Sequence, residues 1–215
     1  MMATASAQSI NQKLRRIPAW PVYLLGAIPF ALLVLQAFTG DLGADPVKFI
    51  ERDLGEWGLK FLVVGLCVTP LRWATGVSMI KYRRAIGLLA FSYVALHLTT
   101  WVVLDLQFRW AEIGADLIKR PYIIIGMIGF LALLPLAVTS NTLSVRRMGA
   151  AAWQKLHKLT YVAALAGATH YMMLVKAWPL EPMLYLGAVI ALLAVRAIRT
   201  WRRSQGALAM GQAAK

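Results

Sequence analysis

Long apolar runs separated by short polar segments dominate the pattern along the chain. Six of these runs are long enough for a membrane-spanning helix, because a hydrocarbon core of about 30 Å needs roughly 20 apolar residues in a helix. They cover approximately residues 18–38, 57–73, 84–104, 121–139, 153–175 and 182–198. The second run has the least defined ends, since its unbroken apolar core, FLVVGLCV, is short. The pattern predicts an all-α integral membrane protein with six transmembrane helices in a bundle.

Composition supports this prediction and excludes several classes of protein. The 215 residues are 60% hydrophobic and 15% charged, which is unlike a soluble domain of this size. The net charge of +14 is spread between the apolar runs rather than gathered on one exposed face, so we expect membrane lipid, and no nucleic acid, as a partner. Cys67, the one cysteine, cannot form an internal disulfide, and redox chemistry would therefore need a cofactor.

Charge placement predicts the orientation of the helices. Most Lys and Arg residues lie in the N-terminal tail, the 72–84 loop, the 140–158 region and the C-terminal end, whereas the other loops hold all nine acidic residues. By the positive-inside rule, both termini are expected in the cytoplasm. Cytoplasmic tails at 1–17 and 201–215 would then flank a transmembrane domain at 18–200. No small-residue cleavage site follows the first run, which is expected to be retained as a helix.

All three histidines lie within the predicted spans. At about 1.5 Å of rise per residue, His97 and His170 share a depth in the outer half of two different spans. His157 lies 13 residues before His170, in the inner half. A single intramembrane histidine is usually structural and bonds to a neighbouring helix. Two at one depth on separate helices instead suit the two axial positions of one haem iron.

Two alternatives to a haem protein are weaker. A proton pump would place carboxylates within its spans, whereas every acid here lies in a loop or at a span edge. A transporter would show two similar halves with broken helices at matching positions, and we find no such repeat, although Gly126, Gly129 and Pro135 would loosen the fourth span. A small haem-free transporter or an assembly factor is the alternative from another class.

Five stretches of the chain resemble the MsrQ (YedZ) family, the haem-binding membrane subunits of the periplasmic methionine sulfoxide reductase system, within the ferric reductase-like transmembrane group. They are LGADPVK (42–48), GLKFLVVGLCVTPLR (58–72), RRAIGLLAFSYVALHLTTW (83–101), KRPYIIIGMIGFLALLPLAVTS (119–140) and WQKLHKLTYVAALAGATHY (153–171). The resemblance covers roughly residues 18–200.

The resemblance implies a b-type cytochrome of the bacterial inner membrane with one or two haems, and FMN as a further cofactor linked to the family. Electrons would come from the quinone pool or a cytosolic flavin reductase. They would pass to a periplasmic molybdenum-containing subunit that reduces methionine sulfoxide in oxidised proteins. The chain would be the electron-transfer subunit and would not carry the sulfoxide-reducing site. A ferric or other metal reductase is the alternative of related architecture.

The inner site departs from the wider group, whose members carry two histidines about 13 residues apart on each of two helices. Here Arg84 stands 13 residues before His97. We expect His157 to serve an inner site that holds a five-coordinate haem, a haem with another side chain as ligand, or a flavin or quinone. Arg84 could bind a haem propionate or a flavin phosphate bidentately. Its alternative role is simple anchoring at the cytoplasmic surface.

Three further expectations concern geometry. His157 and His170 would lie about 140° apart around one ideal helix, so a shared face requires the helix to deviate, and no proline lies between them. The second imidazole nitrogen of each ligand should donate a hydrogen bond to a backbone carbonyl or a threonine. The candidate threonines are Thr99, Thr100, Thr160 and Thr169. The longest outer loop, 39–56, is too short for a nucleotide-binding domain, so donor and acceptor should be separate molecules.

Overall fold

The computed structural model describes residues 5–174 and 179–213, and within these ranges the chain forms helices and no strand. The helices are α1 (Ala5–Arg16), α2 (Trp20–Thr39), α3 (Pro46–Thr75), η1 (Ile80–Tyr82), α4 (Arg83–Thr99), η2 (Thr100–Asp105), α5 (Trp110–Lys119), α6 (Pro121–Val138), α7 (Thr142–Met148), α8 (Ala150–Leu156), α9 (Leu159–Leu174) and α10 (Leu180–Ala213). The all-α prediction is confirmed.

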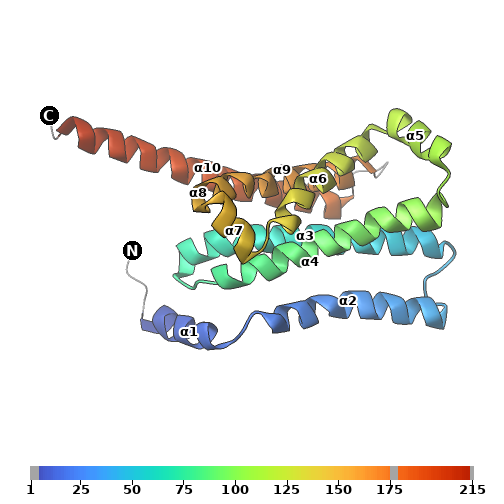
Figure 1. The fold of residues 1–215 in the computed structure, drawn as a ribbon, viewed down its shortest axis with the longest axis horizontal. Helices are drawn as coiled ribbons and strands as arrows, with labels where there is room; N and C mark the ends of the chain where they lie inside the picture. The colour runs from blue at the N-terminus through green and yellow to red at the C-terminus, as the bar shows by residue number, and fades with distance from the viewer. Residues whose placement is uncertain (1–4, 175–178, 214–215) are drawn as a thin grey trace.

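The bundle is built around two closely packed helix pairs. The most extensive contacts are those of α3 with α4 and of α6 with α9. α2 lies against α4 and α3 on one side of these pairs, and α10 lies against α9 and α3 on the other. Both termini lie at one end of the bundle, and α5 lies at the opposite end, which we call the α5 end (Figure 1).

Small residues allow these helices to approach one another. α9 buries a stripe of alanines at positions 163, 164, 166 and 168. A Cβ added to Gly129 of α6 would lie 3.4 Å from the Cβ of Ala166, so the backbones are near contact. Larger side chains fill the space toward α10, where Leu66 and Val189 are fully buried. Close packing through small residues is typical of helices within a membrane.

Five helical segments are long and apolar enough to cross a membrane: Trp20–Thr39, Pro46–Thr75, Ile80–Asp105, Pro121–Val138 and Leu180–Gly206. Their outward faces expose large apolar side chains such as Leu25, Phe38 and Leu131, as a lipid-facing surface would. These segments match five of the six predicted spans. The remaining prediction, 153–175, matches a shorter helix, because α9 has 16 residues and the predicted end at Val175 lies outside the described residues.

The predicted start of the second span is wrong by about three helical turns. α3 begins at Pro46, so residues 46–56 belong to a helix and not to an outer loop. The Asp45 side chain caps this helix by accepting a hydrogen bond from the Lys48 backbone N–H at 3.1 Å, and Pro46 occupies the first turn. The regions predicted as tails are also largely helical, in α1 and in the last turns of α10.

The prediction of one continuous helix over 153–175 is also wrong, because the helix breaks at His157 and Lys158. α8 ends at Leu156 and α9 begins at Leu159. Short-range backbone bonds replace the α-helical ladder here, from the Lys158 N–H to the Lys155 carbonyl and from the Thr160 N–H to the His157 carbonyl. The angle calculated for one straight helix therefore does not apply to His157 and His170.

A tyrosine hydroxyl from α4 completes the backbone hydrogen bonding of α2. Tyr93 donates to the Gly26 carbonyl at 2.7 Å and accepts from the Phe30 N–H at 3.0 Å, so its hydroxyl lies between two groups that would bond to each other in a regular helix. Pro29, within the same turn, lacks an N–H of its own. The hydroxyl thus joins α2 to the rest of the bundle.

Tyr93→Phe is expected to destabilise the protein by about 1–3 kcal/mol, because it leaves the buried Gly26 carbonyl and the partly buried Phe30 N–H without their partner. Thermal unfolding in detergent should show a Tm lower by at least about 2 °C. Tyr23→Phe is the matched control, since Tyr23 lies on an exposed part of α2. Equal Tm values for the two variants would contradict the bridging role of the Tyr93 hydroxyl.

Candidate functional site

The structure brings His97 and His170 together across the interface of the two helix pairs. His97 lies near the end of α4 and His170 near the end of α9. Their ring centroids are 6.1 Å apart, and the ring planes are inclined at 76°. The predicted pairing by depth is therefore matched by a close approach of the two rings.

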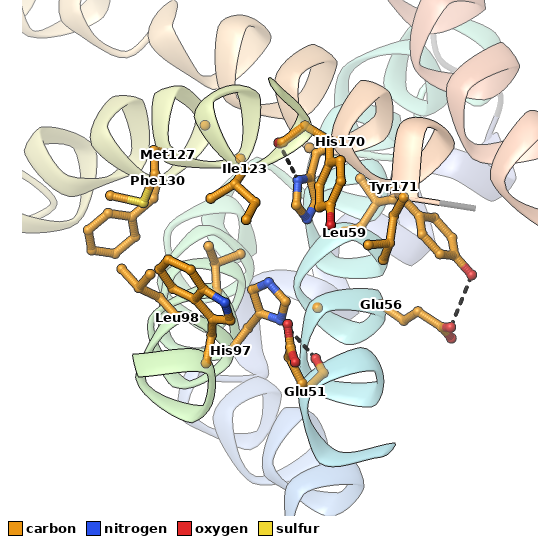
Figure 2. Close-up of a pocket in the computed structure, with 18 of the residues that line it drawn as sticks. Glu51, Glu56, Leu59, His97, Leu98, Ile123, Met127, Phe130, His170 and Tyr171 are labelled. Atoms are coloured by element: carbon orange, nitrogen blue, oxygen red, sulfur yellow. Dashed lines mark hydrogen bonds between the residues drawn. The ribbon is translucent and has the colours of Figure 1, made fainter. Parts of the chain in front are cut away.

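Each of these two imidazoles is oriented by a backbone carbonyl of the neighbouring helix. His97 Nδ1 lies 2.8 Å from the Glu51 carbonyl oxygen of α3, and His170 Nδ1 lies 2.7 Å from the Tyr122 carbonyl oxygen of α6. A carbonyl oxygen can only accept, so Nδ1 carries the proton in both rings and Nε2 of the neutral ring has a free lone pair. Figure 2 shows the second nitrogen of each ring on the side that faces the other histidine.

Glycines make both of these hydrogen bonds sterically accessible. Gly55 and Gly126 each follow, by one helical turn, the residue whose carbonyl accepts the bond. A Cβ on Gly55 would lie 3.1 Å from His97 Nδ1, and a Cβ on Gly126 would lie 2.8 Å from His170 Nδ1. The second distance is shorter than real Cβ contacts, so any side chain at residue 126 would displace the ring.

A cavity of about 340 Å³ surrounds the two rings between α3, α4, α6 and α9. Its deep wall is apolar, and the side chains that form it include Leu62, Phe130, Leu133 and Ala163. Trp101 also lines it, and this residue is buried in η2, a π-helical turn directly after α4. π-Helical turns are frequent at functional sites. The polar residues of the cavity lie mainly toward the α5 end, on the first turns of α3 and before α6.

The donor set fits a metal centre held between two imidazoles. Two metal–nitrogen bonds of about 2 Å, the length seen for histidine ligands, place ring centroids about 6 Å apart. The observed 6.1 Å agrees with that separation. The apolar walls and the glycine backbones leave room for a flat, largely apolar group around such a centre. A planar tetrapyrrole has this shape, and its iron accepts two axial imidazoles.

His157 lies apart from these two residues, at the turn between α8 and α9. Its ring stacks on Trp153 with centroids 3.6 Å apart, and its Nδ1 lies 3.1 Å from the Trp153 carbonyl oxygen. The Trp153 indole is itself fixed by donating to the Thr139 carbonyl at 2.9 Å. Within the described part of the chain, His157 Nε2 is buried without a hydrogen-bond partner. This nitrogen is oriented and free to bind a ligand, but no second histidine faces it.

Two arginines, Arg83 and Arg84, are exposed in the first turn of α4. Arg83 is the residue whose charge acts on both His157 and Arg196. Arg196 of α10 is buried; its guanidinium donates to the carbonyls of Leu66 and Leu192 and lies over the ring of Tyr161. Cationic groups of α4 and α10 thus lie toward the inner histidine, and the role predicted for Arg84 stays a prediction.

The hydrogen-bond partners of His97 and His170 are backbone carbonyls and not threonine side chains. Thr99 and Thr100 bond to carbonyls of their own helix, those of Ala95 and Leu96. The carbonyls of Glu51 and Tyr122 serve the imidazoles instead. The sequence predicted neither these two carbonyls nor the contacts of Gly55 and Gly126 with the imidazoles. The glycines themselves are visible in the sequence and indicate places where helices can pack closely. Which histidine each glycine faces depends on how the helices align, and that is a tertiary property.

Comparisons with known proteins agree with this geometry. Residues 54–168 match the family model described as ferric reductase like transmembrane component. The chain is 46% identical over 204 residues to a protein of Brucella anthropi, covering 94% of this chain and 92% of the relative, and that protein is named protein-methionine-sulfoxide reductase heme-binding subunit MsrQ. A Brucella ovis protein of the same name is 46% identical over 186 residues, covering 86% of this chain and 84% of the relative. The chain belongs to the MsrQ family.

Membership in the MsrQ family confirms the resemblance seen in the sequence. The match to the ferric reductase-like model includes His97 and His157, and it ends two residues before His170. The matches to the two Brucella relatives extend over most of the chain. The similarity to these relatives thus extends beyond the segment that matches the family model.

Proposed function

We propose that this protein is a b-type cytochrome of the bacterial inner membrane that passes electrons to a periplasmic methionine sulfoxide reductase. Its acceptor is a molybdenum-containing subunit, and its donor is the quinone pool or a cytosolic flavin reductase. The two His rings facing each other at 6.1 Å across the interface of the two helix pairs carry this proposal. The Brucella relatives support it through their name, which describes a heme-binding subunit of that system.

His97 and His170 are the proposed axial ligands of an outer haem, which supplies reversible one-electron chemistry at its iron when bound. With both Nε2 atoms bound to it, the iron would keep no open position for dioxygen, which would favour electron transfer over oxygen activation. The carbonyls of Glu51 and Tyr122 hold the protons of the two Nδ1 atoms and keep both rings in the ligating tautomer. The apolar wall of the cavity excludes water from the centre.

The topology suits transfer across a membrane. We propose that α9 is the sixth span, and that both termini lie in the cytoplasm. The location of both termini at one end of the bundle supports an even number of crossings (Figure 1). His157, at the end of the bundle where both termini lie, then serves an inner cofactor site for haem, FMN or quinone, and Arg84 is the proposed contact for a propionate or a flavin phosphate.

The absorption spectrum of the purified protein tests the cytochrome proposal. The oxidised and dithionite-reduced forms are expected to show the Soret and sharp α bands of low-spin, six-coordinate haem b. The cofactor content per chain, measured on the intact protein, will give the number of haems. A colourless protein after expression with adequate haem supply would eliminate the proposal.

A ferric reductase is the second candidate, favoured by the description of the matching family model. The two functions differ in the electron acceptor. Reduced protein in vesicles is expected to transfer electrons to a purified periplasmic sulfoxide reductase faster than to ferric chelates. The opposite preference would favour metal reduction.

A further inference from the structure

Cationic side chains from two helices surround the open end of the cavity. Lys48 and Arg52 belong to the first two turns of α3, and Arg120 directly precedes α6. All three line the cavity and remain partly or largely exposed at the α5 end. The deep wall of the same cavity is apolar, so the cationic side chains that line the cavity lie at its open end.

The cationic side chains at this open end differ in how far carboxylates neutralise them. Lys48 Nζ is 2.6 Å from an Asp105 carboxylate oxygen and 3.1 Å from one of Glu51. Glu56, the other acid that lines the cavity, is engaged by Lys60 at 3.3 Å and by the Tyr171 hydroxyl at 3.0 Å (Figure 2). Both acids of the cavity therefore already have cationic or hydrogen-bonding partners.

The guanidinium groups of Arg52 and Arg120 have N–H donors that no carboxylate engages in the described residues. Arg120 meets Asp116 through one nitrogen, at 3.3 Å, and its side chain is 50% exposed. Arg52 forms no ion pair with any carboxylate in the part of the chain that the structure describes. A guanidinium has five N–H donors and binds carboxylates bidentately. The open end of the cavity thus offers two such groups, from opposite helix pairs.

We propose that Arg52 and Arg120 bind the two propionates of the outer haem and fix its orientation, with the carboxylate edge toward the α5 end. This inference rests on the proposed function, because it requires haem between His97 and His170. The propionates are the only charged substituents of haem b, and burying a carboxylate against the apolar wall without a partner is costly. With arginines at one edge of the cavity and apolar side chains at the other, haem with its propionates toward the α5 end is favoured over haem in the reverse orientation.

The same contacts set the reduction potential. A cation near the propionates disfavours the ferric state, which carries one more positive charge than the ferrous state, so removing the cation lowers the potential. The variants Arg52→Gln and Arg120→Gln are each expected to shift the midpoint potential of the outer haem downward. The double variant should change the reduction equilibrium about tenfold, which is about 59 mV for a one-electron couple.

Redox titration of the purified haem-containing protein measures this shift, and transfer of haem to apomyoglobin measures retention. Both arginine variants should release haem faster than the unmodified protein. Arg109→Gln is the matched control, because Arg109 also lies near the α5 end, is 53% exposed and pairs with Glu112, but does not line the cavity. Arg52→Lys retains the charge and should restore most of the potential but less of the retention.

Three results would overturn the inference. An unchanged potential and unchanged haem release in the double variant would exclude propionate binding. An equal shift in Arg109→Gln would show a general effect of surface charge. Loss of electron transfer to the sulfoxide reductase with unaltered haem properties would instead assign Arg52 and Arg120 to partner docking. A protein without any haem would be recognised from its spectrum and would refute the proposed function itself.

Discussion

His170→Ala is expected to abolish six-coordinate haem binding at the outer site, and His97→Ala is expected to have the same effect. Each substitution removes one of two Nε2 donors that meet across the helix pairs, and no other histidine lies near enough to replace it among the residues described. The haem content and the low-spin spectrum of the purified variants measure this loss. His157→Ala should leave the outer haem largely intact, because His157 lies at the α8–α9 turn.

Chemical rescue separates a lost ligand from a misfolded protein. The variants His97→Gly and His170→Gly leave a space that free imidazole can fill, so added imidazole should restore the low-spin spectrum. A His97→Ala variant that keeps a full six-coordinate haem would show that His97 and His170 do not bind the same iron.

Gly126→Ala is expected to have nearly as large an effect, although residue 126 contributes no ligand. The added Cβ would lie 2.8 Å from His170 Nδ1 and 3.1 Å from its Cε1. Because the ring is confined between α6 and α9, it must turn or move away from the Tyr122 carbonyl and lose the hydrogen bond that orients it. Loss of such an orienting partner typically reduces metal affinity about 10–100-fold.

Gly55→Ala should act in the same way on His97, but more weakly, because its Cβ would lie 3.1 Å from Nδ1. Gly65→Ala is the matched control on α3, where the nearest contact would be an ordinary 3.5 Å to an Ile86 methyl group. Haem release should be fastest for Gly126→Ala, intermediate for Gly55→Ala and slowest for Gly65→Ala. The size of the change in midpoint potential should decrease in the same order. If Gly126→Ala retained haem like Gly65→Ala, the glycine would not be needed for the ring position.

The pairing of His97 with His170 could be predicted because helical rise per residue is nearly constant. Depth along a span then follows from sequence position wherever the helix is continuous, as α4 is around His97 and α9 is around His170. His157 shows where this condition fails: the helix breaks at that residue without a proline, through short-range bonds that no local residue pattern marked. The early start of α3, by contrast, was signalled by the Asp45–Pro46 capping pair.

The orienting carbonyls could not be predicted from the sequence. The acceptor for His97 is 46 residues away along the chain, and that for His170 is 48 residues away. Any residue type can supply a backbone carbonyl, so composition carries no information about these acceptors. Their location depends on how α3 aligns with α4 and α6 with α9, which side-chain packing decides.

Each half of the centre is contained within one helix pair. α4 contributes an imidazole that α3 already orients, and α9 contributes one that α6 already orients. An iron held by both imidazoles would therefore act as a non-covalent crosslink across the seam between two preformed modules. Because α3 and α4 precede α6 and α9 in the chain, such a crosslink would join an earlier module to a later one.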